Sequence, residues 1–228
     1  MGAAMGARLV HSGCTVLTEL AHRSPKTIQR ATDAGFQDAT LPEIVKRAQW
    51  ILSVLPPSDA LALAERVRDA WSQDRKVVYV DCNAVNPDTS RAIGKVLEAV
   101  PGLVYLDGSI IGGPPSPPGA PEDKVYDPAI YASAAPKDEK SLDDFVKLGV
   151  QYGLRVIPLK GEGAGIGDAS ALKMSYAVRL SSSLVLEPFI HGTVEGITKG
   201  IIGIFTTMVL GTSHDKCQSR LPTYEKPC

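Results

Sequence analysis

The chain has 228 residues, of which 44% are hydrophobic and 21% are charged, and its formal net charge is −1 at pH 7. This length can bury the core of one or two globular domains. The balanced charge, without a basic stripe, excludes nucleic acid and anionic membranes as expected partners. The four cysteines and four histidines lack the spacing of metal ligands, so we expect no metal site and a reducing, cytoplasmic setting.

Predicted helices and strands alternate along the chain as they do in parallel α/β proteins. Helices are predicted over residues 3–12, 25–34, 41–48, 58–70, 87–99 and 140–152, and strands over residues 15–20, 50–55, 77–81, 103–107, 130–134 and 154–158. This alternation predicts a doubly wound, mostly parallel sheet with helices on both faces. The apolar segment 196–211 is too short to span a bilayer comfortably, so we expect a buried helix there and no membrane partner.

The first residues match the end of a dinucleotide-binding motif. In such βαβ units a strand runs into Gly-x-Gly-x-x-Gly, and the helix that follows points its N-terminus at the pyrophosphate. Here the chain begins Met-Gly-Ala-Ala-Met-Gly-Ala-Arg-Leu, so only the last glycine of the motif, Gly2, is present. We therefore expect the first strand and the first two glycines to be missing, and Gly2 to lie at the cofactor.

This opening, Met-Gly-x-x-Met-x-x-x-Leu followed by a turn at Ser12-Gly13 and a predicted strand, resembles the β-hydroxyacid dehydrogenases, the group of 3-hydroxyisobutyrate and 6-phosphogluconate dehydrogenases. The resemblance implies a Rossmann-like NAD(P)-binding domain over residues 1–160 and part of an all-α domain over residues 161–228. It implies an oxidoreductase that transfers a hydride between NADP and a small hydroxy acid. It further implies a homodimer formed through the helical domain where that domain is complete.

The loop after the predicted strand 15–20 bears on the choice between NADP and NAD. An acidic residue there would bind the ribose hydroxyls of NAD, whereas Arg23 and Ser24 can pair with the 2′-phosphate of NADP. Glu19 lies just before the loop and keeps NAD possible. The alternative is that Arg23 is a solvated surface charge and Ser24 only a helix cap.

Two later loops complete the cofactor-binding pattern. Leu55 and Pro56 resemble the family's turn beside the nicotinamide ribose, and the segment from Asp81 to Asn83 resembles the one after the next strand. The resemblance therefore assigns Leu55, Pro56 and Asn83 to the cofactor. Prolines that merely end a strand are the alternative interpretation.

Residues 107–113 resemble the family's substrate loop, in which a serine and two glycines hold a carboxylate. The resemblance assigns Ser109, Gly112 and Gly113 to the substrate, although Ile111 stands where the family has its serine. The proline-rich stretch 114–119 that follows favours extended backbone, with a simple linker as the alternative.

The segment from Gly163 to Lys173 resembles the glycine-rich turn that opens the family's interdomain helix. The resemblance assigns Lys173 as the general acid/base, a role that requires a lowered pKa. Tyr176, one turn further on, would contact the substrate in place of the family's missing asparagine. A lysine on a helix is otherwise most often a solvated charge.

The last part of the chain departs from the pattern. Residues 178–195 interrupt the helical periodicity, and we expect them to be an insertion; the tail 212–228 is also expected to be foreign. The missing strand, Ile111 and the partial helical domain together favour an alternative function, that of a catalytically inactive dinucleotide-binding or structural protein.

Overall fold

The structure is a computed structural model that describes residues 1–72 and 75–186. It divides into two compact units, Met1–Ala171 and Leu172–Cys228, whereas the sequence places the boundary after residue 160. The second half of the expected insertion, the apolar segment 196–211 and the tail 212–228 lie outside the described residues.

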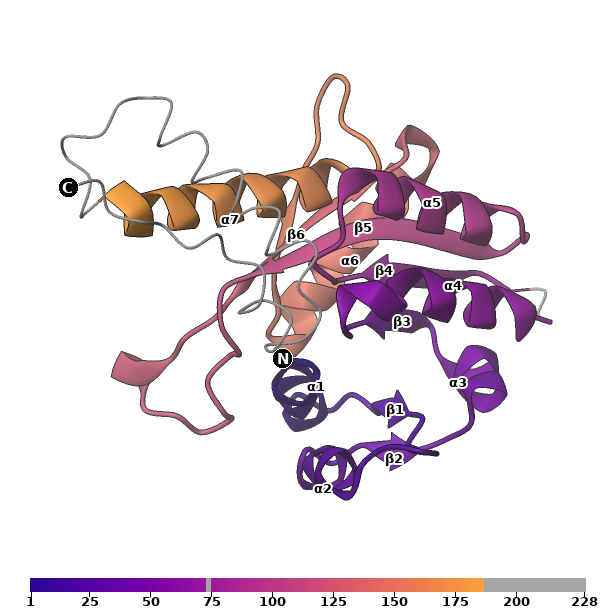
Figure 1. The fold of residues 1–228 in the computed structure, drawn as a ribbon. Coiled ribbons are helices and arrows are strands. Elements are labelled where there is room, and N and C mark those ends of the chain that lie inside the picture. Colours follow the sequence, from indigo (N-terminus) through magenta and orange to yellow (C-terminus); the bar gives the residue numbers. More distant parts are fainter. Residues whose placement is uncertain (73–74, 187–228) are drawn as a thin grey trace, which may run out of the picture. The chain divides into compact units, whose positions relative to one another are not determined.

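The first unit contains two sheets rather than one (Figure 1). The larger has five strands in the order β3 (Trp50–Ser53), β4 (Val77–Asp81), β5 (Leu103–Ile111), β6 (Ala129–Ala134) and β7 (Arg155–Pro158). The smaller pairs β1 (Leu17–Thr18) with β2 (Gln37–Asp38). All neighbours are parallel except β5 and β6. The expected mostly parallel α/β arrangement is confirmed. Its strands form two separate sheets, with the break between β1 and β3.

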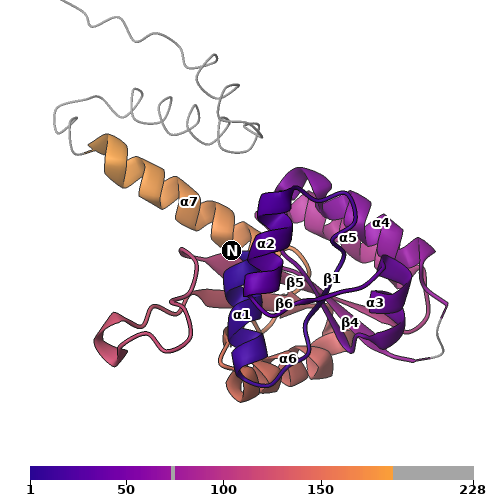
Figure 2. The same cartoon turned by 90° about the horizontal axis from the view of Figure 1, so that it is seen from below.

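Helices cover both faces of the larger sheet (Figure 2). The helices of the first unit are α1 (Gly2–His11), α2 (Pro25–Asp33), α3 (Leu41–Arg47), α4 (Ala60–Asp69), α5 (Pro87–Glu98) and α6 (Glu139–Tyr152). On one face α1 and α6 bury Met5, Leu142 and Phe145, and on the other α3, α4 and α5 bury Val45, Val67 and Leu97. Every residue of β4 is buried, because alternate side chains enter the two cores.

Local sequence signals explain why α2 and α5 begin where the sequence predicts. The Ser24 side chain accepts a hydrogen bond from the Thr27 N–H at the start of α2, and Asn86 does the same for Thr89 at the start of α5. Each cap is followed by a proline, whose missing N–H has no helical partner to lose. Gly153 ends α6 in the left-handed conformation, with φ of 72°.

One long helix, α7 (Asp168–Leu186), begins in the first unit and continues in the second. It remains helical across residues 178–186, the first half of the expected insertion, so the weakened periodicity there does not end the helix. Among the described residues, no helix combines the length and the apolar character that a membrane span requires.

Candidate functional site

The loops after β3 and β4 are joined by the side chain of Asn83. Its oxygen accepts a hydrogen bond from the Leu55 N–H at 2.6 Å, and its amide donates to Ser53 Oγ at 2.7 Å and to Asp81. Asn83 is only 3% exposed, so these bonds replace water. Two residues expected to bind the cofactor, Leu55 and Asn83, are therefore in direct contact at the carboxyl ends of parallel strands, where ligands bind in such sheets.

Gly2 occupies the first position of α1 and lies beside the same edge of the sheet. A Cβ atom at Gly2 would lie 3.6 Å from the carbonyl oxygen of Val54, the residue before Leu55. The N-terminus of α1, with its unpaired N–H groups and partial positive charge, thus adjoins the loop after β3. This arrangement suits an anionic group such as a pyrophosphate.

The loop that follows β1 presents Arg23 and Ser24 on the surface. Both residues are exposed, and His22 before them has a positive φ of 61°. The Ser24 hydroxyl lies 3.3 Å from the Thr27 nitrogen and 3.0 Å from Thr27 Oγ1, so it does cap α2. A capping serine accepts through its oxygen and can still offer its hydrogen to an anion.

Glu19, the acid that would favour NAD, already has two partners. Its carboxylate lies 2.6 Å from the Arg66 guanidinium and accepts a hydrogen bond from the Leu41 N–H at 3.2 Å. The hydrogen bond from Arg66 lowers the pKa of Glu19 below its usual value, and the charge of Arg23 acts in the same direction. Glu19 is therefore ionised and already engaged in hydrogen bonds.

Two buried aspartates lie in the sheet close to Asn83, and the sequence analysis assigned them no role. Asp81 and Asp107 are paired in register on β4 and β5, and both are 0% exposed. Burial raises the pKa of Asp81 to about 6, with a further contribution from the charge of Asp107, and burial also raises the pKa of Asp107. The available signal was that both predicted strands end in an aspartate.

Asp107 also fixes the start of α7. Its carboxylate accepts hydrogen bonds from the backbone N–H groups of Gly167 and Ser170, at 3.0 and 3.1 Å, and from Ser170 Oγ at 2.7 Å. A carboxylate in this position satisfies N–H groups of the first helical turn and complements the helix dipole. The first turn of α7, which lies within the first unit, is thus anchored to β5.

The residues expected to bind substrate lie on β5 and the loop beyond it. Ser109 is 0% exposed, and its hydroxyl has no hydrogen-bond partner among the described residues. Gly112 has φ of 123°, and a Cβ there would fall 2.0 Å from the Tyr126 hydroxyl, which accepts a hydrogen bond from the Gly113 N–H at 3.2 Å. Tyr126, which sequence reasoning missed, therefore contacts both glycines of this loop.

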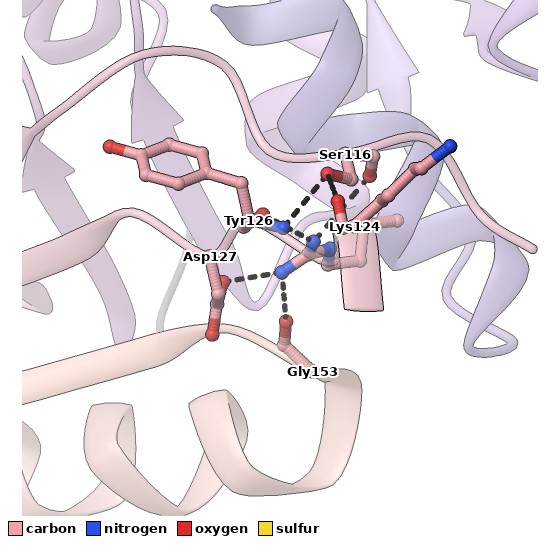
Figure 3. Close-up of polar contacts among 6 residues, drawn as sticks. Ser116, Lys124, Tyr126, Asp127 and Gly153 are labelled. Carbon is pink, nitrogen blue, oxygen red and sulfur yellow. Dashed lines mark hydrogen bonds and ion pairs between the residues drawn. The ribbon is translucent and has the colours of Figure 1, made fainter. Parts of the chain in front are cut away.

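The loop between β5 and β6 is fastened to α1 by Arg8 (Figure 3). The guanidinium pairs with Asp127 and donates to the carbonyl oxygens of Tyr126 and Gly153, each at 3.3 Å. Within the loop, the Ser116 hydroxyl donates to the Lys124 carbonyl oxygen and accepts from the Tyr126 N–H. Hydrogen bonds thus hold the loop that contains the proline-rich stretch at several points, both to Arg8 of α1 and within the loop itself.

Lys173 and Tyr176 belong to the second unit, where they lie one turn apart on α7. Lys173 is partly exposed and Tyr176 is 47% exposed. No cluster of histidine, cysteine or carboxylate side chains suited to a metal occurs in the part of the chain that the structure describes.

No protein-family profile and no curated protein matches the sequence. Among solved structures, the conserved protein MTH1747, described as similar to 3-hydroxyacid dehydrogenases, is 26% identical, with a TM-score of 0.65 over 96% of this chain and 76% of its own. Mycobacterium tuberculosis 3-hydroxyisobutyrate dehydrogenase, solved with L-serine, is 19% identical, with a TM-score of 0.63 over 97% and 72%.

An imine reductase variant from Myxococcus stipitatus, solved with NAD+, is 20% identical, with a TM-score of 0.60 over 96% of this chain and 66% of its own. The chain therefore has a β-hydroxyacid dehydrogenase-like fold, one that nicotinamide-dependent enzymes share.

Proposed function

We propose that this chain binds NADP at the edge formed by the loops after β1, β3 and β4, as an oxidoreductase of the β-hydroxyacid dehydrogenase type. The observation that carries the proposal is the state of the loop after β1. Glu19 is held by Arg66 and by the start of α3, while Arg23 and Ser24 remain exposed. A guanidinium and a hydroxyl suit a 2′-phosphate, whereas an engaged carboxylate is poorly placed to bind ribose hydroxyls.

The remaining groups at this edge fit the other parts of such a cofactor. The N-terminus of α1 at Gly2 would hold the pyrophosphate, and the turn at Leu55 and Pro56, fixed by Asn83, would hold the nicotinamide ribose. When bound, the cofactor would supply the hydride. Lys173 would exchange a proton with the substrate hydroxyl, as the family resemblance implies.

The substrate class follows from the fold and from the glycine-rich loop after β5. The family resemblance assigns Ser109, Gly112 and Gly113 to the carboxylate of a small hydroxy acid. Because the Gly113 N–H donates to Tyr126 and Ser109 is buried, Tyr126 would have to move for this loop to receive the carboxylate. Imine reductases share this fold, so imines form a second substrate class for assay. The expected homodimer, formed through the helical domain, remains a prediction.

The experiment is a calorimetric titration with NADPH and NADH, followed by a turnover assay over β-hydroxy acids and imines. NADPH binding stronger than NADH binding, with turnover of one substrate class, supports the proposal. The burial of Ser109 and the hydrogen bond from the Gly113 N–H to Tyr126 favour the second candidate function, a dinucleotide-binding protein without turnover. Binding without turnover of any substrate selects that candidate, and absence of binding rejects both.

A further inference from the structure

The side chain of Tyr126 covers the two glycines of the loop after β5. Its hydroxyl accepts a hydrogen bond from the Gly113 N–H at 3.2 Å. The same hydroxyl fills the space that a Cβ atom would take at Gly112, where φ is 123°. Both the backbone conformation and the phenol therefore require glycine at position 112. The contact with Tyr126 accounts for this glycine without any ligand.

The backbone of Tyr126 is held on both sides, while its ring is half-exposed. Its N–H donates to Ser116 Oγ at 2.8 Å, and its carbonyl oxygen accepts from the Ser116 N–H at 3.0 Å and from the Arg8 guanidinium at 3.3 Å. The residue is 48% exposed, and its ring points away from Ser116 and Lys124 (Figure 3). The ring can therefore leave Gly113 by rotation of the side chain, without loss of the bonds that hold the loop.

The Gly113 N–H cannot serve Tyr126 and a bound carboxylate at the same time. A backbone amide has one hydrogen to donate, so the phenol and a carboxylate exclude each other there. Neither neighbour on β5 replaces this donor, because Ser109 is 0% exposed and Ile111 has an apolar side chain. A ligand that needs the Gly113 N–H therefore binds only when the phenol has moved away, which lowers the apparent affinity of that ligand.

We propose that Tyr126 determines the specificity of this loop, because its phenol competes with the carboxylate of a hydroxy acid for the Gly113 N–H. The inference rests on the proposed function, which takes the loop after β5 as the substrate site. Hydrogen bonds to a charged acceptor are about twice as strong as those between uncharged groups, so a carboxylate can displace the phenol. The displacement lowers the affinity for acids and does not affect ligands without a carboxylate. Tyr126 thus shifts the preference of the site from acids toward uncharged substrates.

The test compares the parent chain with Tyr126→Phe, which keeps the ring and removes only the hydroxyl. The probe is 3-hydroxybutanoate, titrated with and without saturating NADPH, because two reduced ligands form a complex that cannot turn over. NMR of the Gly113 amide, in protein that carries ¹⁵N-labelled glycine, reports binding at this N–H. Tyr126→Phe should lower the dissociation constant of the acid by about 2- to 10-fold, the effect of one hydrogen bond. In the ligand-free variant the Gly113 amide should also exchange faster with solvent.

Three controls separate competition from a general effect on the loop. Butan-2-ol has a methyl group where the acid has its carboxylate, so its affinity should be the same for the parent chain and for Tyr126→Phe. Val125→Ala shortens the neighbouring side chain, which is 55% exposed, and should leave the affinity for the acid unchanged. Tyr126→Ala removes the whole ring and should bind the acid at least as tightly as Tyr126→Phe. Thermal unfolding checks that each variant is folded.

Three results would overturn the inference. Equal affinity for the acid in the parent chain and in Tyr126→Phe would mean that the phenol does not compete. Weaker binding in Tyr126→Phe would mean that the hydroxyl donates to the carboxylate and assists its binding. No response of the Gly113 amide in either protein would mean that this loop does not receive the acid. A failure of the proposed function is seen separately, as the absence of NADPH binding, and the titration without nucleotide still reports on Tyr126.

Discussion

The side-chain oxygen of Asn83 accepts a hydrogen bond from the Leu55 N–H at 2.6 Å, which joins the loops after two neighbouring parallel strands. Both loops lie at the edge where the chain is proposed to bind its cofactor. The shape of that edge therefore depends on one buried amide, which a substitution can remove without changing charge.

Replacing Asn83 with alanine should destabilise the fold and weaken cofactor binding. The change leaves the Leu55 N–H and Ser53 Oγ without their partner in a buried setting, at a cost of about 2–4 kcal/mol in the free energy of unfolding. Asn86→Ala is the matched control, because it removes only the cap of α5, worth about 1 kcal/mol. Urea unfolding of both variants measures the difference; equal losses would mean that Asn83 contributes no more than a helix cap.

The buried aspartates predict how stability depends on pH. Asp81 has a pKa of about 6 in the folded protein, above its value near 4 in the unfolded chain, so the folded state binds more protons between these values. This contribution to stability is complete below about pH 4 and is lost as the pH rises through about 6.

Asp81→Asn removes this titratable group, so the free energy of unfolding should change less between pH 4 and pH 8. At pH 7 the variant should be more stable than the parent chain by up to about 3 kcal/mol. Unfolding midpoints measured from pH 4 to pH 8 compare the two proteins. If the parent chain instead becomes more stable relative to Asp81→Asn as the pH rises from 4 to 8, its surroundings do not hold Asp81 protonated.

Arg8 should control the order of the loop between β5 and β6. Arg8→Met keeps much of the packing of the side chain but removes its bonds to Asp127 and to the carbonyl oxygens of Tyr126 and Gly153. We expect faster hydrogen exchange at Ser116 and Tyr126 and a loss of about 1–3 kcal/mol in stability. Lys147→Met, on an exposed part of α6, is the control. Unchanged exchange in the loop would mean that Arg8 does not hold it.

The catalytic assignment makes a separate kinetic prediction. Lys173→Met should lower turnover by about 10²- to 10⁴-fold and leave NADPH affinity nearly unchanged, since a general acid/base acts on the proton transfer. The corresponding limb of the pH–rate profile should also disappear. Turnover within a few-fold of the parent chain, with the same profile, would assign the proton transfer to another group.

Much of the fold could be predicted from the sequence, because local signals determine it. The caps at Ser24 and Asn86 and the apolar run of β4 place their elements to within one or two residues. β2 was missed because Gln37 and Asp38 carry no apolar pattern and pair only through their backbone. The extension of β5 to Ile111 was missed because it depends on pairing with β6, which is distant in the sequence.

Part of the candidate site could likewise be predicted from the sequence, and part of it could not. The contact between Leu55 and Asn83 could be expected, because the one lies at the end of a predicted strand and the other just after the next, and parallel strands bring such positions together; their role at the cofactor stays a prediction from the family resemblance. The engagement of Glu19 by Arg66 could not be predicted, since it joins residues 47 positions apart through side chains alone. Likewise, only the folded structure pairs Tyr126 with the glycines of the loop after β5.

The most direct test of the central claim is a calorimetric titration of the parent chain and of Arg23→Glu with NADPH and NADH. Lys95→Glu, which makes the same change of net charge at an exposed position on α5, is the control. The account predicts that Arg23→Glu weakens NADPH binding by about 10- to 150-fold, from the loss of a charge-assisted contact worth about 1.5–3 kcal/mol, and leaves NADH binding equal or stronger. Undiminished NADPH affinity in Arg23→Glu, or no binding of either nucleotide to the parent chain, would contradict it.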